Sequence, residues 1–169
     1  ESKKFYVNRI NIKGNDITEE NVIRNLLVVD EGDPFNELLN AKSINQIKGS
    51  NLFGKVDFDV VENDNQKDIN ITVEEKPTGE ISAGAGVGSS GSTISFSIKE
   101  NNWLGRGVKL ESTLNLSEEK ISGNIFVNNP NYNYSGNSAF ASLDVSSTDR
   151  SNSSGFKSSK TGFKIGTSF

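Results

Sequence analysis

Apolar and polar residues alternate along most of the second half of this 169-residue sequence. About six segments show this alternation, which is the pattern of half-buried β-strands. Their apolar members are Ile81, Ala83, Ala85 and Val87; Ile94, Phe96 and Ile98; Val108, Leu110, Leu114 and Leu116; Ile121, Gly123, Ile125 and Val127; Ala139, Ala141, Leu143 and Val145; and Phe163 and Ile165. Successive side chains of a strand point to opposite faces, so each segment predicts one apolar face. That face can pack on a protein core or meet lipid in a membrane barrel.

The pattern changes near Lys76-Pro77-Thr78-Gly79. Before this point helical and strand patterns are mixed, and after it strand alternation dominates while glycine and serine become more frequent. We therefore predict a first domain over residues 1–76 and a strand-rich second domain over residues 77–169.

The first domain is predicted to have the element order β-α-α-β-β. A strand covers Phe5 to Ile12 and ends at the turn residues Gly14-Asn15-Asp16. Thr18 is the expected N-cap of a helix with apolar residues at 22, 23, 26 and 27. A second helix starts near Asn36. Two alternating segments, around Phe58 and Ile71, complete a small sheet covered by two helices, an α+β fold.

Composition excludes several classes of function. The sequence contains no histidine and no cysteine, and its formal net charge is −4. Ser-His-Asp triads, thiolate sites and histidine-ligated metals are therefore impossible, and binding to nucleic acid is disfavoured. Gly86 to Gly91 matches G-x-G-x-x-G, but a strand pattern follows instead of the helix that a dinucleotide site requires. We expect no enzyme activity, cofactor or metal.

Several short motifs then point to a family. Glu31-Gly32 follows the first helix, and Leu52-Phe53-Gly54 leads into the next strand. Three further motifs follow in order: Gly84-Ala85-Gly86-Val87-Gly88, Asn102-Trp103-Leu104-Gly105-Arg106-Gly107 and Asn129-Pro130-Asn131-Tyr132. Over nearly its whole length the sequence resembles BamA-type outer-membrane assembly factors, with a barrel-adjacent POTRA domain followed by the first strands of a transmembrane β-barrel.

The resemblance implies a function without covalent chemistry: assembly and insertion of β-barrel proteins into the outer membrane, with the POTRA domain in the periplasm. It implies three kinds of partner, namely unfolded outer-membrane proteins, accessory assembly lipoproteins and outer-membrane lipid. Family members carry several POTRA domains and sixteen barrel strands, so the chain is expected to be a fragment. Phe169 is accordingly expected inside a strand and not at the C-terminus of a barrel.

Three groups of site residues follow from the resemblance. The first barrel strand is expected to form a lateral gate, with the residues Glu80, Ile81, Ser82, Ala83, Gly84, Ala85, Gly86, Val87 and Gly88. Its glycines either weaken strand pairing or permit close backbone approach. Glu31 is expected to contact an accessory lipoprotein, or to be part of a solvated turn. Trp103, Tyr132 and Tyr134 are expected at the membrane interface, although ordinary burial is the alternative for Trp103.

Two other functions stay open at this point. One is a related pore that secretes proteins or assembles autotransporters. The other is a soluble β-sandwich adhesin, whose apolar strand faces would be buried in a core. The Ser- and Asn-rich stretch from Ser146 to Lys160 is expected to be a long extracellular loop or a flexible linker.

Overall fold

The computed structural model describes residues 4–88, 91–134 and 136–168. The chain forms two compact units, Glu1–Thr78 with Leu104–Arg106, and Gly79–Trp103 with Gly107–Phe169. Among the helices of the described residues, none is long and apolar enough to cross a membrane.

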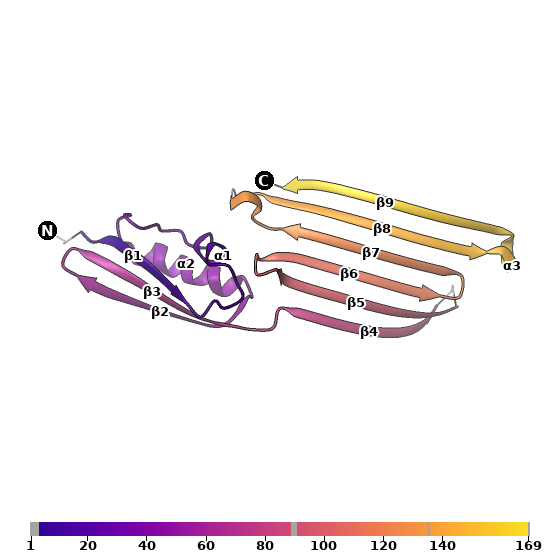
Figure 1. The fold of residues 1–169 in the computed structure, drawn as a ribbon, viewed down its shortest axis with the longest axis horizontal. Helices are drawn as coiled ribbons and strands as arrows, with labels where there is room; N and C mark the ends of the chain where they lie inside the picture. The colour runs from indigo at the N-terminus through magenta and orange to yellow at the C-terminus, as the bar shows by residue number, and fades with distance from the viewer. Residues whose placement is uncertain (1–3, 89–90, 135, 169) are drawn as a thin grey trace. The chain divides into compact units, whose positions relative to one another are not determined.

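The first unit has the predicted order β-α-α-β-β (Figure 1). Its elements are β1 (Tyr6–Lys13), α1 (Glu20–Arg24), α2 (Glu37–Gly49), β2 (Phe53–Asn63) and β3 (Gln66–Glu75). The sheet order is β1-β3-β2, with β1 parallel and β2 antiparallel to β3. As predicted, α2 starts after Asn36, whose side chain accepts hydrogen bonds from the backbone N–H groups of Leu38 and Leu39.

The core of this unit lies on one face of the sheet. Cross-strand pairs such as Val56–Val73 and Val60–Ile69 bring apolar side chains of β2 and β3 together. Ile23 from α1 and Ile47 from α2 are fully buried against the same cluster. Every buried hydrophobic residue found in the described chain belongs to this unit.

The N-terminus of α1 differs from the prediction. The residue that precedes the helix is Glu19, which makes no side-chain cap, so the assignment of Thr18 as N-cap is wrong. Thr18 is buried, and its backbone N–H donates to Glu75 Oε1 at 2.6 Å. The N–H of Ile17 donates to Glu75 Oε2 at 2.9 Å. A carboxylate at the end of β3 therefore holds the turn that leads into α1.

The Glu75 carboxylate should make this turn sensitive to acid. Partial burial favours a higher pKa, but hydrogen bonds from Thr18, Ile17 and Asp16 outweigh it and lower the pKa of Glu75. The unfolded chain then binds the proton more readily than the folded chain. The stabilisation is complete above the ordinary carboxyl pKa and is lost as the pH falls through the lower pKa of folded Glu75.

We expect Glu75→Gln to destabilise the turn by about 1 kcal/mol, because it removes charge-assisted hydrogen bonds. Hydrogen exchange at the Ile17 and Thr18 amides of the whole protein, measured at neutral and at acidic pH, reports the effect. Glu74→Gln is the matched control, since exposed Glu74 loses the same charge and only a 3.8 Å contact with Lys55. Equal protection in both variants would contradict the prediction.

The second unit contains the six strands expected from the alternation. They are β4 (Gly79–Gly88), β5 (Gly91–Trp103), β6 (Val108–Ser117), β7 (Lys120–Asn129), β8 (Ser138–Arg150) and β9 (Phe156–Ser168). A short 3-10 turn, η1 (Tyr132–Tyr134), precedes β8, and the one-turn helix α3 (Ser151–Ser154) precedes β9. Each strand is antiparallel to the next, and the sheet order is the sequence order.

The expectation of a long loop from Ser146 to Lys160 is wrong. The strands β8 and β9 pair from Ser146–Lys160 as far as Arg150–Phe156, and only α3 and Gly155 lie outside them. Gly155 adopts φ +70°, a left-handed conformation that suits glycine at the end of a helical turn. Serine, threonine and lysine occupy both faces of this hairpin, so the sequence shows no alternation there.

Candidate functional site

The first strand of the second unit, β4, is an edge strand, and among the described residues it pairs only with β5. Every one of its ten residues is exposed. Ile81 is 81% exposed and Val87 88% exposed, values that are unusual for large apolar side chains of a folded sheet. The structure thus places all of the predicted gate residues, Glu80 to Gly88, on one open edge.

The glycines of β4 have no local steric function in the described chain. A Cβ atom added at Gly84, Gly86 or Gly88 would meet nothing within 4 Å, and none of the three has a positive φ. Within the described residues, no backbone approaches these glycines closely enough to require them. What remains is their effect on strand stability, since glycine weakens a strand by about 0.5–1 kcal/mol relative to alanine.

The six strands present one apolar face. Their register aligns apolar residues in rows that cross the sheet. One row contains Ile81, Ile98, Ile125, Leu143 and Phe163, with Ser112 of β6 as its polar member. On β6 the apolar run from Leu110 to Leu116 rises about 20 Å, at about 3.4 Å per residue. This height approaches the apolar band of roughly 25 Å found on membrane barrels.

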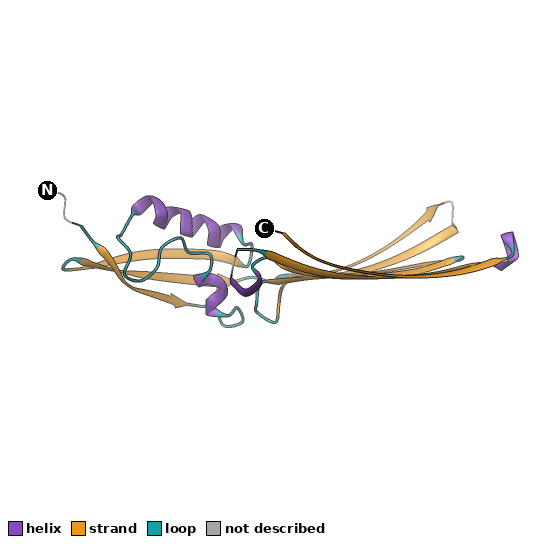
Figure 2. Cartoon of the chain, turned by 90° about the horizontal axis from the view of Figure 1, so that it is seen from above, coloured by secondary structure: helices purple, strands orange, loops and turns teal. Residues whose placement is uncertain are grey.

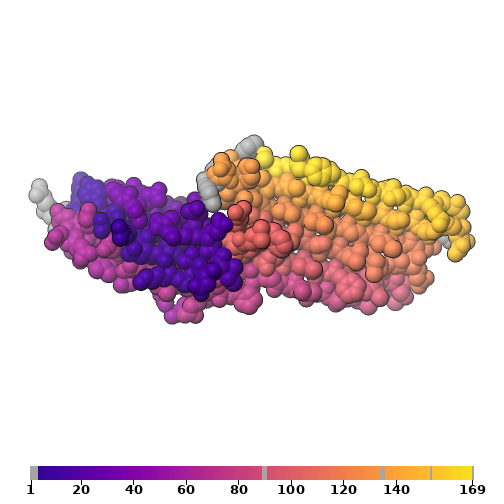
Figure 3. Space-filling view, viewed as in Figure 1, coloured from indigo at the N-terminus to yellow at the C-terminus, as the bar shows by residue number. Residues whose placement is uncertain are grey.

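The opposite face is polar and hydrogen-bonded across strands. Ser82 and Ser97 hydroxyl oxygens are 2.6 Å apart, and Asn124 donates to Asp144 at 2.7 Å. Figure 2 shows the sheet edge-on as a single layer, and in the space-filling view its strands form adjacent bands of colour (Figure 3). A β-sandwich needs a second sheet on the apolar face, and the described residues supply none.

The aromatic residues predicted for the membrane interface belong to one end of the sheet. Trp103 is the last residue of β5, and Tyr132 and Tyr134 lie between β7 and β8. The β5–β6 and β7–β8 connections are at the same end of the sheet because successive strands alternate in direction (Figure 1). A register shift between Glu100 and Trp103 pairs Trp103 with Val108, on the apolar face. Trp103 is 45% exposed and Tyr132 58%. The side chain of Tyr134 and all of Phe169 lie outside the described parts.

Glu31 has structural contacts that the sequence did not indicate. Its Oε1 atom accepts a hydrogen bond from the backbone N–H of Ile10 at 2.9 Å, and Arg24 Nη1 is 3.7 Å away. The same arginine donates from Nη2 to the carbonyl of Ile10 at 3.0 Å. The side chain remains 45% exposed, so it is also accessible to a partner.

The outer edge of β1 is covered by the segment after Glu31. The N–H of Val7 donates to the carbonyl of Asp33 at 2.9 Å, and the N–H of Phe35 donates to the carbonyl of Phe5 at 2.8 Å. Since β3 is central in this sheet, β2 provides its other edge. In the described chain no such segment pairs along the outside of β2.

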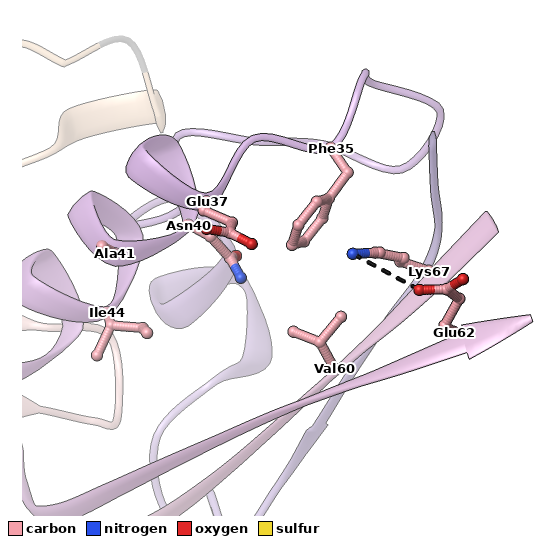
Figure 4. A pocket seen from close by; sticks show the side chains of 8 residues that line it. All are labelled: Phe35, Glu37, Asn40, Ala41, Ile44, Val60, Glu62 and Lys67. Atoms are coloured by element: carbon pink, nitrogen blue, oxygen red, sulfur yellow. Dashed lines mark ion pairs between the residues drawn. The ribbon is translucent and has the colours of Figure 1, made fainter. Parts of the chain in front are cut away.

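A pocket of about 290 Å³ lies between α2 and β2 (Figure 4). Lys67 Nζ lies 4.5 Å from the centre of the Phe5 ring and 4.3 Å from that of Phe35, and it is 4.0 Å from Glu62. Buried Asn40 also lines the pocket, and its Oδ1 atom has no hydrogen-bond partner. Sequence reasoning missed this group because its members come from α2, β2, β3 and the segments that precede β1 and α2.

In residues 4–88, 91–134 and 136–168, no group of three histidine, cysteine, aspartate or glutamate residues is gathered at one place.

Comparisons with known proteins agree with this architecture. The family model for POTRA, described as "Surface antigen variable number repeat", matches residues 5–76. The outer membrane protein assembly factor BamA of Neisseria meningitidis serogroup B is 27% identical over 138 residues, which cover 79% of this chain and 17% of that protein. The chain thus spans about a sixth of the length of this relative.

Solved structures show the same fold. BamA from Haemophilus ducreyi lacking POTRA domains 1-3 has a TM-score of 0.83 and 24% identity, and the match covers 95% of this chain and 32% of that one. CdiB from Escherichia coli has a TM-score of 0.62 and 15% identity, covering 98% and 33%. The fold is that of a POTRA domain joined to antiparallel strands of barrel type. The matching curated relatives are outer membrane protein assembly factors named BamA, so the chain resembles a fragment of a BamA-family protein.

Proposed function

We propose that this chain contributes to the assembly and insertion of β-barrel proteins into the outer membrane, with β4 as a lateral gate. The observation that carries the proposal is the composition of β4, which has three glycines without a steric requirement in the described chain and a single charged residue, Glu80. An unpaired edge offers a row of backbone N–H and C=O groups to an incoming strand. Weak pairing of β4 lowers the cost of exchanging its barrel partner for a client strand.

The side chains of β4 suit strand addition. Sheet edges that must avoid foreign strands are often covered or carry charges. The outer edge of β1 is covered by residues 33–35. In contrast, Glu80 is the only charged residue of β4. An edge of this kind pairs readily with the alternating apolar and polar residues of a barrel strand.

The remaining parts have supporting roles in this proposal. The apolar face meets outer-membrane lipid, with Trp103, Tyr132 and Tyr134 at the interface. The first domain lies in the periplasm, where the open edge of β2 binds clients transiently. The exposed carboxylate of Glu31 binds an accessory lipoprotein, while its Oε1 atom also holds the edge of β1.

Site-specific photocrosslinking tests the gate. A photoreactive amino acid at Ala83 in the whole protein should capture a client barrel protein during its insertion. The control is Leu114, which lies in the same cross-strand row of the apolar face but on the inner strand β6. Equal capture at both positions would contradict the gate. Capture only from the polar face, for example at Ser95, would favour the related pore, in which substrate passes through the barrel.

A further inference from the structure

A second pocket, of about 400 Å³, lies on the polar face of the sheet where β7, β8 and β9 meet. The register pairs Lys120 with Thr148, and Thr148 with Ser158, so the three side chains share this face. Lys160 and Arg150 belong to the same face through their pairs with Ser146 and Phe156. The strand β4 starts at Gly79 at one end of the sheet, and the β6–β7 and β8–β9 turns lie at the other end (Figure 1). The pocket is next to these two turns.

The pocket has an excess of positive charge. Three cationic side chains, Lys120, Arg150 and Lys160, line it together with one carboxylate, Glu119. Arg150 Nε is paired with Glu119 Oε2 at 2.8 Å. Among the described residues, neither Lys120 nor Lys160 takes part in an ion pair. Two ammonium groups, each with three hydrogen-bond donors, are therefore left for an anion.

The spacing of the two lysines indicates the size of the ligand. Their strands, β7 and β9, lie on either side of β8, about 10 Å apart at about 4.8 Å per strand. Lys160 is two residues beyond Ser158, which adds an offset of about 7 Å along the strand. A lone phosphate can engage one lysine fully, whereas a larger ligand can reach both.

The groups between the lysines fit a sugar. Hydroxyl groups of Ser146, Thr148 and Ser158 line the pocket and can exchange hydrogen bonds with sugar hydroxyls. Phe156 also lines it and is 45% exposed, so its ring offers an apolar surface to the C–H face of a sugar ring. We infer that this pocket binds a phosphorylated saccharide, with the phosphate bound by one of Lys120 and Lys160 and a sugar hydroxyl bound by the other lysine.

The site is held in place before any ligand binds. The N–H of Asp149 donates to the carbonyl of Glu119 at 2.8 Å, which ties the β6–β7 turn to β8. Asp149 and Lys157 form a 2.7 Å ion pair on the other face, and the N–H of Gly155 donates to the carbonyl of Arg150 at 2.9 Å. A site that is already ordered loses less conformational entropy on binding.

Calorimetric titration of the whole protein in detergent micelles tests the inference with three probes: glucose 6-phosphate, glucose and inorganic phosphate. Glucose 6-phosphate should bind most tightly. The double variant Lys120→Gln/Lys160→Gln should weaken its binding roughly tenfold or more, through loss of charge-assisted hydrogen bonds. The matched control, Lys109→Gln/Lys164→Gln, removes the same charge from the same face outside the pocket and should change the affinity less than about twofold.

Two further measurements complete the test. One separates the contribution of the saccharide from that of the phosphate, and the other distinguishes a lipid headgroup from a free sugar phosphate as the ligand. Phe156→Ala should reduce the preference for glucose 6-phosphate over inorganic phosphate. Equal affinity for these two probes, or equal losses of affinity in both double variants, would overturn the inference.

Flotation identifies the source of the ligand. It compares vesicles that contain a phosphorylated disaccharide lipid with phosphatidylglycerol vesicles. Selective flotation that depends on Lys120 and Lys160 indicates a lipid headgroup; binding of glucose 6-phosphate without it indicates a free sugar phosphate.

Discussion

Replacing Gly14 by alanine is expected to destabilise the first domain by about 2–6 kcal/mol, the sum of backbone strain and overpacking. Gly14 has φ +88°, and a Cβ atom there would overlap the carbonyl oxygen of Val73. That oxygen belongs to the central strand β3, and Val73 is buried in the core. The contact can be relieved only by moving backbone, which disturbs the pairing of β1 with β3.

Native-state hydrogen exchange of the β1 and β3 amides in the whole protein measures this loss. Gly32→Ala is the control, because Gly32 has a similar φ of +96° but nothing within 4 Å of an added Cβ atom. It should cost only the conformational strain of about 1–2 kcal/mol. If the two variants lose the same stability, the close contact with Val73 is not the reason that residue 14 is glycine.

Alternation with period two was sufficient to predict the six strands of the second unit, whereas the small α+β domain before them also required helical spacing of apolar residues and turn signals. The signal is strong because each strand has one apolar face, as the row from Ile81 to Phe163 illustrates. It failed where both faces are polar. The hairpin ends around Ser146 and Lys160 are held by backbone pairing and by ion pairs such as Asp149–Lys157, which leave no hydrophobic pattern in the sequence.

Contacts between distant residues limited the prediction of sites. Thr18 looks like a helix cap in the local sequence, but Glu75, 57 residues away, binds its backbone. Glu31 reaches Ile10, and Lys67 lies between Phe5 and Phe35. The gate strand could be proposed because the family resemblance includes the contiguous motif Gly84 to Gly88, whereas the two pockets require side chains from several elements.

Replacing Gly84, Gly86 and Gly88 together by alanine should slow client insertion by roughly 10- to 100-fold. Each alanine stabilises a paired strand by about 0.5–1 kcal/mol, and about 1.4 kcal/mol corresponds to a tenfold change in rate. The three sites accept a methyl group without contact inside the described chain, so the variant should fold normally. The initial rate of client folding into proteoliposomes that contain the whole protein measures the effect.

Gly123→Ala separates the gate from a general effect of added methyl groups. Gly123 lies on the inner strand β7, and its added Cβ atom would make ordinary contacts of 3.8 Å with Thr113 and 4.0 Å with Leu114. This variant should insert clients at the normal rate, since β7 is paired on both sides and does not exchange partners. An unchanged rate in the triple variant would mean that opening of β4 does not limit insertion. A faster rate would mean that β4 must be firmly paired, and that its glycines serve another purpose.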